Sequence, residues 1–219
     1  MTAESEQFEP KLIYLAKRNL ALSQPQFLKR WRQHGALGMS LPRWKNISRY
    51  VHCDVMHPAA DAAVLNDKYD GVGLIWHRSA QARAAHLADT TSRSTMERDE
   101  FATFAEPIAN CCLLAREEIV QERDRAASPL TKLFHFATSG TSHAASAWSA
   151  AGIESRGHVV NRPLPPVGAG NWGLNFKLVE EWWFEDIDAV LRAAAVLESQ
   201  RRAAEDVVVM TNEVLLYEA

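Results

Sequence analysis

The order of predicted strands and helices constrains this chain most, because the same order occurs twice. Apolar alternation and helical spacing predict strand, helix, strand, strand, helix, strand in the first 120 residues. The remainder predicts the same βαββαβ order, which is the signature of a ferredoxin-like fold. The expected elements span 11–17, 23–34, 47–55, 69–77, 79–89 and 109–120, then 131–137, 142–152, 155–162, 177–186, 187–204 and 207–218.

The duplication predicts an α+β chain of two tandem ferredoxin-like repeats. We expect the first repeat at 1–120, a charged linker at 121–129 and a shortened second repeat at 130–219. The offset between the halves falls along the chain, so the second half has lost residues. The matched pairs are Lys11 with Lys132, Trp76 with Trp183, and Glu118 with Glu213.

Composition excludes several classes of protein. Hydrophobic residues make up 47% of the chain and charged residues 23%, which is ordinary for a soluble globular protein. The net charge of −3 does not produce the positive electrostatic potential that attracts nucleic acid. Three cysteines suggest neither a disulfide framework nor a zinc set, and no apolar run predicts a membrane span. The acidic, polar N-terminus is unlike a signal peptide, so we expect the cytoplasm.

One glycine motif raises the question of a dinucleotide cofactor. Gly168, Gly170 and Gly173 have the G-x-G-x-x-G spacing. A phosphate-binding turn follows a buried strand and opens a helix, but prolines precede this motif and a predicted strand follows it. We therefore expect a loop that ends at a strand, and no cofactor.

An ordered set of segments carries a family resemblance. The set comprises KLIYLAK, QFLKRWRQHGAL with Trp31, His34 and Gly35, RYVHCDV, YDGVGLIW and AREEIV, with a weaker echo in Glu181 and Trp183. The first half thereby resembles the EthD family of the dimeric α/β-barrel superfamily. The resemblance implies two facing sheets that enclose a barrel. Two repeats in one chain would form it as an internal pseudo-dimer, and a further homodimer stays open.

Alternation along the strands predicts which side chains line that barrel. Val51, Cys53 and Val55 form an apolar set expected under the helices, which leaves Tyr50, His52 and Asp54 for the barrel. The same test, extended by aligning the halves, predicts the following inward residues: Tyr14, His135, His158, Arg162, Asn175, Lys177, Val179, Glu181 and Trp183.

The paired positions differ in chemistry between the halves. Tyr14 corresponds to His135, Tyr50 to His158, and Leu74 to Glu181, so the predicted barrel is asymmetric. We expect His135 or His158 as general base, with Glu181 orienting it or acting as the acid. The family resemblance offers His34 as the competing base. A buried tyrosine or histidine can also be an ordinary core residue.

Other residues are predicted to bind the substrate. Lys177 or Arg162 could hold a carboxylate. Indole side chains suit a flat aromatic guest. The full set of predicted site residues is Tyr14, Tyr50, His34, His135, His158 and Glu181 for catalysis, and His52, Lys177, Arg162, Trp31, Trp76 and Trp183 for substrate binding.

Resemblance and residue chemistry together predict a cofactor-independent lyase for a small aromatic or polyketide-like acid. Decarboxylation is preferred over dehydration. An isomerase or cyclase with the same base is an alternative, and a non-catalytic carrier of a hydrophobic metabolite is another. No metal site is predicted, although His135, His158 and Glu181 would satisfy ligand chemistry if the strand order united them.

Overall fold

Capping residues set where the helices of the first half begin. The structure is a computed structural model that describes residues 9–56, 68–123, 131–141, 144–165, 173–199 and 205–219. Gln26 accepts a 2.8 Å hydrogen bond from the Ser23 backbone at the start of α1, and Ser79 accepts one of 3.0 Å from Ala82 in α2. The first-half elements are β1 (Lys11–Ala16), α1 (Gln24–Ser40), η2 (Pro42–Asn46), β2 (Ile47–Val55), β3 (Gly71–His77), α2 (Ala80–Ala88), α3 (Thr90–Thr103), η3 (Ile108–Asn110) and β4 (Cys112–Gln121).

Helix α3 is absent from the sequence prediction. Its sequence is polar, and its buried residues are Ser92, Met96 and Thr103, so no apolar stripe announces it. Asp89, which ends α2, caps α3 by accepting a 3.0 Å bond from the backbone of Ser92. The predicted helix over 79–89 is therefore the first of two consecutive helices.

The second half follows the predicted order closely. Its first and last strands match the predicted limits, and its helices are shorter than predicted over the described residues. Most of the glycine motif, at 166–172, lies outside the described residues. The elements are β5 (Thr131–Ala137), α4 (Ala144–Ala150), β6 (Gly157–Pro163), β7 (Leu178–Phe184), α5 (Ile187–Ser199) and β8 (Val207–Glu218).

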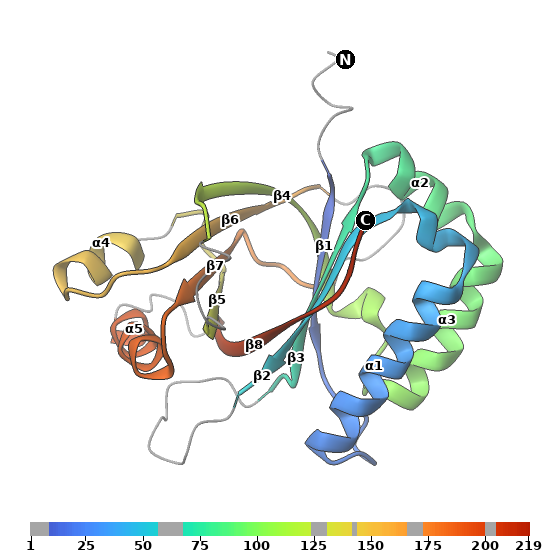
Figure 1. Cartoon of the computed structure of the whole chain (residues 1–219), viewed down its shortest axis with the longest axis horizontal. Coiled ribbons are helices and arrows are strands. Elements are labelled where there is room, and N and C mark those ends of the chain that lie inside the picture. The colour runs from blue at the N-terminus through green and yellow to red at the C-terminus, as the bar shows by residue number, and fades with distance from the viewer. Residues whose placement is uncertain (1–8, 57–67, 124–130, 142–143, 166–172, 200–204) are drawn as a thin grey trace.

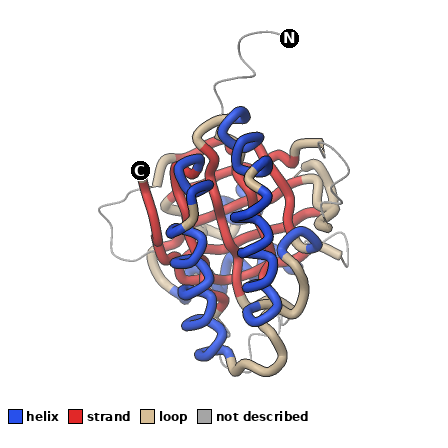
Figure 2. Tube along the Cα trace, turned by 90° about the vertical axis from the view of Figure 1, so that its right-hand side faces the viewer, coloured by secondary structure: helices blue, strands red, loops and turns tan. Residues whose placement is uncertain are grey.

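The eight strands form one closed antiparallel barrel, which confirms the predicted α/β barrel (Figure 1). The first half contributes the order β4-β1-β3-β2 and the second half the order β8-β5-β7-β6. Pairing of β2 with β8 and of β4 with β6 closes the ring. Helices α1–α3 cover the first-half strands, whereas α4 and α5 lie beside the second half (Figures 1 and 2).

Strand register corrects one matched pair. Lys11 lies opposite Ala115 of β4, and Lys132 lies opposite Thr211 of β8. Two residues further along each strand are Glu117 and Glu213, which are therefore equivalent. The predicted partner Glu118 is one residue out of register and points to the other face.

The middle of the barrel is filled by apolar side chains, and a cavity of about 180 Å³ lies at the end lined by Trp76, Glu181 and Trp183. An eight-stranded barrel is just wide enough for side chains to fill it or for one small ligand. One buried cluster joins apolar residues from seven of the eight strands and none from a helix: Ile13, Leu15, Val51, Cys53, Val55, Val72, Leu74, Trp76, Leu113, Ala115, Phe134, Phe136, Val179 and Val209.

The predicted inward face was consequently wrong for most strands. Because helices cover the outer face of the sheet, both faces are buried, and alternation in polarity does not distinguish them. The more apolar set fills the barrel. The predicted barrel residues Tyr14, Tyr50, His52, Asp54, His135 and His158 instead face the helix side, whereas Val179, Glu181 and Trp183 do face inward.

Candidate functional site

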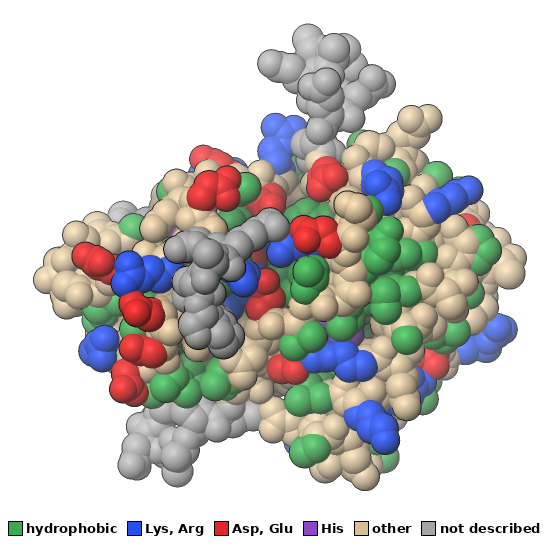
Figure 3. Space-filling view, in the orientation of Figure 1, with side chains coloured by type: hydrophobic (Ala, Val, Ile, Leu, Met, Phe, Trp, Pro, Cys, Tyr) green, Lys and Arg blue, Asp and Glu red, His purple; other side chains and the backbone are tan. Residues whose placement is uncertain are grey.

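A cavity of about 770 Å³ lies between the outer face of the first-half sheet and helices α1–α3. Hydrophobic surface gathers on this side of the molecule (Figure 3). The cavity is mainly apolar, with a few polar groups that converge on it, which is the usual composition of a small-molecule site. Its lining includes Tyr14, His34, Trp44, Tyr50, Arg83 and Met96.

His34 is the cavity's best-positioned base. It lies on α1, is 2% exposed, and its Nδ1 is 2.7 Å from Oδ2 of Asp99 on α3. Asp99 also accepts a bond of 2.5 Å from Arg30. Burial raises the pKa of Asp99, but the bonds from Arg30 and His34 lower it overall, so Asp99 is a carboxylate. A carboxylate at Nδ1 fixes the proton there and leaves Nε2 with a lone pair.

Burial keeps His34 neutral. It lowers the pKa of His34, and Asp99 opposes this only in part. Among the described residues, none bonds to Nε2. The imidazole is therefore unprotonated at neutral pH and able to accept a proton from a ligand in the cavity.

Two tyrosine hydroxyls meet in the same cavity. The Tyr14 and Tyr50 oxygens are 3.3 Å apart, and Trp31 Nε1 donates to Tyr14 at 3.0 Å. Burial raises the pKa of both phenols, so both stay protonated at any physiological pH. Each can donate a hydrogen bond, and neither is a base.

Tyr50 is connected through His52 to a charged pair near the surface. His52 Nε2 lies 2.5 Å from the Tyr50 hydroxyl, and Arg32 Nη1 lies 2.5 Å from His52 Nδ1. Both carboxylate oxygens of Asp54 lie 2.6 Å from Arg32 Nη2. Burial lowers the pKa of His52 well below its ordinary value, with Arg32 adding to the effect. The Trp31 indole stacks on the His52 ring at 3.7 Å.

The end of the cavity near α2 carries more polar groups. Arg83 Nη1 lies 3.2 Å from Nε2 of His77, whose Nδ1 donates to the Pro10 carbonyl at 3.3 Å. Burial lowers the pKa of His77, and it lowers that of His86 to about 4. Arg43 and Arg93 also line the cavity, as do Glu97 and Glu100, so the lining carries charges of both signs.

The histidines predicted as bases form a separate cluster on the second-half sheet. His158 Nε2 lies 3.1 Å from Glu180 Oε1, and His135 Nδ1 lies 3.4 Å from Glu180 Oε2. Asp206 lies 3.6 Å from the other nitrogen of His135. Their carboxylate partner is thus Glu180, because Glu181 points into the barrel. The predicted grouping of both histidines with Glu181 is wrong.

His158 borders a shallow groove beneath α4. The groove measures about 790 Å³ and is lined by Trp148, Ile153 and Arg156 among others. His158 stacks on Trp182 at 3.3 Å. This groove is separate from the cavity that holds His34.

Glu181 belongs to a buried charge network at one end of the barrel. It forms ion pairs with Lys11 and, at 2.6 Å, with Lys132. Lys11 also pairs with Glu117, and Lys132 with Glu213 at 3.0 Å. Although burial raises the pKa of Glu181, the two lysines hold it well below its ordinary value. Glu181 is therefore a carboxylate matched by cations and not a proton donor.

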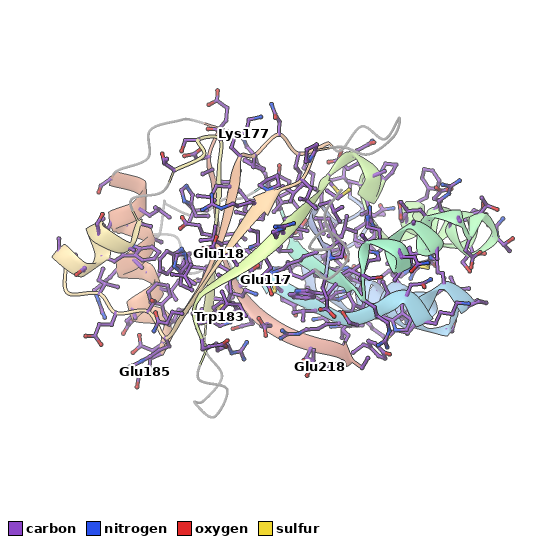
Figure 4. The ribbon with its side chains drawn as sticks, turned by 90° about the horizontal axis from the view of Figure 1, so that it is seen from above. Glu117, Glu118, Lys177, Trp183, Glu185 and Glu218 are labelled. Carbon is purple, nitrogen blue, oxygen red and sulfur yellow. The ribbon has the colours of Figure 1, made fainter. Side chains whose placement is uncertain are left out.

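The predicted indole residues divide between two places. Trp76 and Trp183 lie inside the barrel, where Lys11 and Lys132 sit 4.5 Å and 4.4 Å from their rings. Trp31 lies on α1 and packs against His52. Glu117 and Trp183 are marked in Figure 4 on the strands that carry this network.

The two predicted carboxylate-binding cations lie at the surface. Lys177, which precedes β7, is exposed and bonds to Asn175 at 3.2 Å, and Figure 4 shows it far from Trp183. Arg162 is 60% exposed and pairs with Glu118 at 3.5 Å. Neither lines the barrel, so the predicted inward position was wrong for both.

Metal and thiol chemistry find no support in the described part of the chain. It holds no group of three or more histidine, cysteine or acidic residues that could bind a metal. Burial raises the pKa of Cys53, Cys111 and Cys112 to about 12, so these thiols are not nucleophiles. No helix among the described residues is long and apolar enough to cross a membrane.

Sequence reasoning missed several residues that complete the site. Asp99 lies on the unpredicted helix α3, and Arg32 lies within the segment QFLKRWRQHGAL but is not among the predicted site residues. The i, i+2 spacing of Arg32 and His34 on one helix puts them on different faces.

Comparisons with known proteins agree with this fold. Residues 19–108 match the family model described as the EthD domain. No curated protein matches the chain. A solved structure of an anthrone oxidase-like protein is similar with a TM-score of 0.59 at 12% identity, covering 95% of this chain and 92% of that one.

Two further solved structures share the fold. A Lactobacillus acidophilus protein named provisionally as a monooxygenase has a TM-score of 0.50 at 10% identity, covering 98% of both chains. A mutant chlorite dismutase from Candidatus Nitrospira defluvii has a TM-score of 0.52 at 7% identity, covering 93% of this chain and 91% of that one. Residues 19–108, which supply α1–α3 and most of the residues that line the large cavity, thus match the EthD domain, in agreement with the sequence resemblance.

Proposed function

We propose that this protein is a cofactor-independent enzyme that removes a proton from a small, flat, phenolic or enolisable compound. The observation that carries the proposal is the pairing of His34 with Asp99 inside an apolar cavity. This arrangement has a neutral base, a carboxylate that orients it, and a pair of hydrogen-bonded tyrosines that line the same cavity. Acid–base catalysis needs these parts, and a positioned base typically contributes 10²–10⁴-fold.

In the proposed step, the ligand lies in the cavity with an acidic O–H or C–H bond facing His34 Nε2. The Nε2 lone pair takes the proton, and the electron pair of the broken bond stays on the ligand as a phenolate or enolate. Asp99 stabilises the imidazolium that forms, since it holds the Nδ1 proton. The Tyr14–Tyr50 pair would donate a hydrogen bond to the developing oxyanion.

Loss of CO2 from a phenolic acid is the first reaction we propose to follow from this anion. The carbon–carboxylate bond breaks after the ring carbon takes a proton, which the imidazolium of His34 can return. Arg83 and Arg43, which line the cavity, are suitable partners for the carboxylate. Dehydration, isomerisation or cyclisation would use the same base.

Oxidation is the second candidate, and similarity to the anthrone oxidase-like protein favours it. An aromatic carbanion can pass an electron to dioxygen and then combine with it, so that dioxygen is both oxidant and co-substrate. His34 would have the same role as in the lyase reaction. The lyase reaction releases CO2, whereas the oxidation consumes dioxygen.

The experiment is a thermal-shift screen of phenolic acids and anthrones, followed by assays of each compound that binds. Evolved CO2 identifies the lyase, and consumption of dioxygen identifies the oxidase. Turnover lost in His34→Ala supports the proposal in either case. Binding without any turnover of the bound compounds would favour the carrier.

The architecture behind this site is also a proposal. The orders β4-β1-β3-β2 and β8-β5-β7-β6 are the same when each half is numbered from its own first strand, which supports two tandem ferredoxin-like repeats at 1–120 and 130–219 joined by 121–129. In this arrangement one chain closes a barrel by itself. A further homodimer and a cytoplasmic location remain predictions.

A further inference from the structure

The hydrogen bonds around Tyr14 and Tyr50 leave one hydroxyl proton unused. Arg32 can only donate, so His52 Nδ1 must accept its bond. The neutral His52 then carries its proton on Nε2 and donates it to the Tyr50 oxygen. The hydrogen bonds therefore all run in one direction, from Arg32 through His52 to Tyr50.

The Tyr14 oxygen is occupied in a similar way. Trp31 Nε1 has only a proton to give, so Tyr14 accepts that bond. The two phenols have two protons, and one of these forms the bond between them, whichever oxygen donates it. The other proton has no acceptor among the described residues.

We propose that the Tyr14–Tyr50 pair presents this unshared proton to the cavity and binds a phenolate or enolate oxygen of the ligand there. Both residues line the cavity, and burial keeps both protonated. Arg32 and His52 are positioning residues. If His52 carried its proton on Nδ1, Nε2 would accept from Tyr50 and consume the unshared proton. Arg32, held by both oxygens of Asp54, prevents that tautomer.

This inference rests on the proposed function for its ligand class, but it is tested by binding alone. The probes are 4-nitrophenolate and its uncharged isostere 4-nitrotoluene, with affinities measured at a pH where nitrophenol is ionised. One hydrogen bond to a charged oxygen favours the phenolate by about 10- to 100-fold. The wild type should show this preference.

The variants follow from counting protons. Tyr14→Phe and Tyr50→Phe each leave one hydroxyl with a free proton, so each single variant should keep most of the preference. Only the double variant Tyr14→Phe/Tyr50→Phe should lose it. Tyr69→Phe is the matched control, because that hydroxyl lies outside the cavity. A double variant that still prefers the phenolate overturns the proposal.

The positioning role has its own readouts. Arg32→Met should reduce the preference about tenfold, whereas Arg32→Lys keeps an N–H donor and should restore most of it. In the wild type, ¹⁵N NMR of labelled histidine should report a neutral His52 protonated on Nε2, whether or not any variant folds. A His52 protonated on Nδ1 overturns the proposal.

The outcomes separate this inference from the proposed function. If His34→Ala loses turnover but the wild type shows no preference for the phenolate, the proposed base stands and the proposed tyrosine donor is overturned. If the wild type prefers the phenolate but turns over none of the screened compounds, the proposed tyrosine donor stands and the carrier function is favoured. A wild type that binds neither probe overturns the inference.

Discussion

His34 of α1 and Asp99 of α3 are joined by a 2.7 Å contact between Nδ1 and Oδ2. The two helices are separated in the sequence by β2, β3 and α2, so the complete fold is needed to bring the pair together. Among the histidines that the structure describes, His34 has both an orienting carboxylate and an apolar cavity. Several measurable consequences follow from it.

The substitution His34→Ala should lower kcat by at least about a hundredfold, because a positioned base typically contributes 10²–10⁴-fold. His158→Ala is the matched control, since His158 is also a buried histidine with a carboxylate partner but lies on the other half of the barrel. It should retain turnover within a few-fold. Steady-state kinetics on the compound found by screening decide between them. If His158→Ala lost turnover and His34→Ala kept it, the catalytic site would lie in the second half of the chain.

The pH dependence of kcat/KM should show an acid limb below the ordinary histidine range. Burial lowers the pKa of His34, and the base acts only when neutral. Activity should therefore persist below about pH 6.5 and fall as the pH drops through the lowered value.

Asp99→Asn should move that limb to lower pH, because Asp99 raises the pKa of His34. It should also reduce turnover about a hundredfold, since an amide no longer fixes the Nδ1 proton. A limb that moves to higher pH in Asp99→Asn would contradict the assignment.

The sequence predicted the order of strands well because each strand is a short apolar run bounded by turns or charged residues. It did not predict α3, because the residues of this helix are mostly polar. Such a helix is stable only when it packs against the rest of the domain. Strand-like periodicity identifies two faces but not which of them is inside.

The residues of the candidate site were also predicted only in part. His34, Tyr14 and Tyr50 could be identified from family resemblance or chemistry, and all three line one cavity. The predicted location was the barrel interior, and the cavity instead lies on the helix side. Asp99 and Arg32 could not be identified, because their partners are distant in sequence and only the fold brings them together.

The buried charge network should make Glu181 essential for stability. Glu181→Gln would leave Lys11 and Lys132 short of a counter-charge inside the barrel, and breaking a buried pair costs about 3–5 kcal/mol. Glu118→Gln removes an exposed partner of Arg162 and should change the free energy of unfolding by less than about 1 kcal/mol. Urea denaturation at neutral pH measures both. Equal effects would mean that the network contributes little.

Acid should weaken the same network. Glu213 has a folded-state pKa of about 2, below its ordinary 4.5, so its contribution is complete above about pH 4.5. That contribution is lost as the pH falls toward 2, because protonation is easier in the unfolded chain. The free energy of unfolding of the wild type should decline over this window, and that of Glu213→Gln should decline less steeply.

Gly73 should resist even a single added methyl group. It lies opposite Tyr14 on the neighbouring strand, and a Cβ at this position would overlap the Tyr14 ring. Tyr14 is 1% exposed and bonded to Trp31, so it cannot move without losing packing and a hydrogen bond. Gly73→Ala should therefore cost about 1–3 kcal/mol of stability, the usual range for overpacking. Gly140→Ala, where a Cβ meets nothing within 4 Å, should be close to neutral. If Gly73→Ala were as stable as Gly140→Ala in urea denaturation, the close packing of Tyr14 against β3 would be wrong.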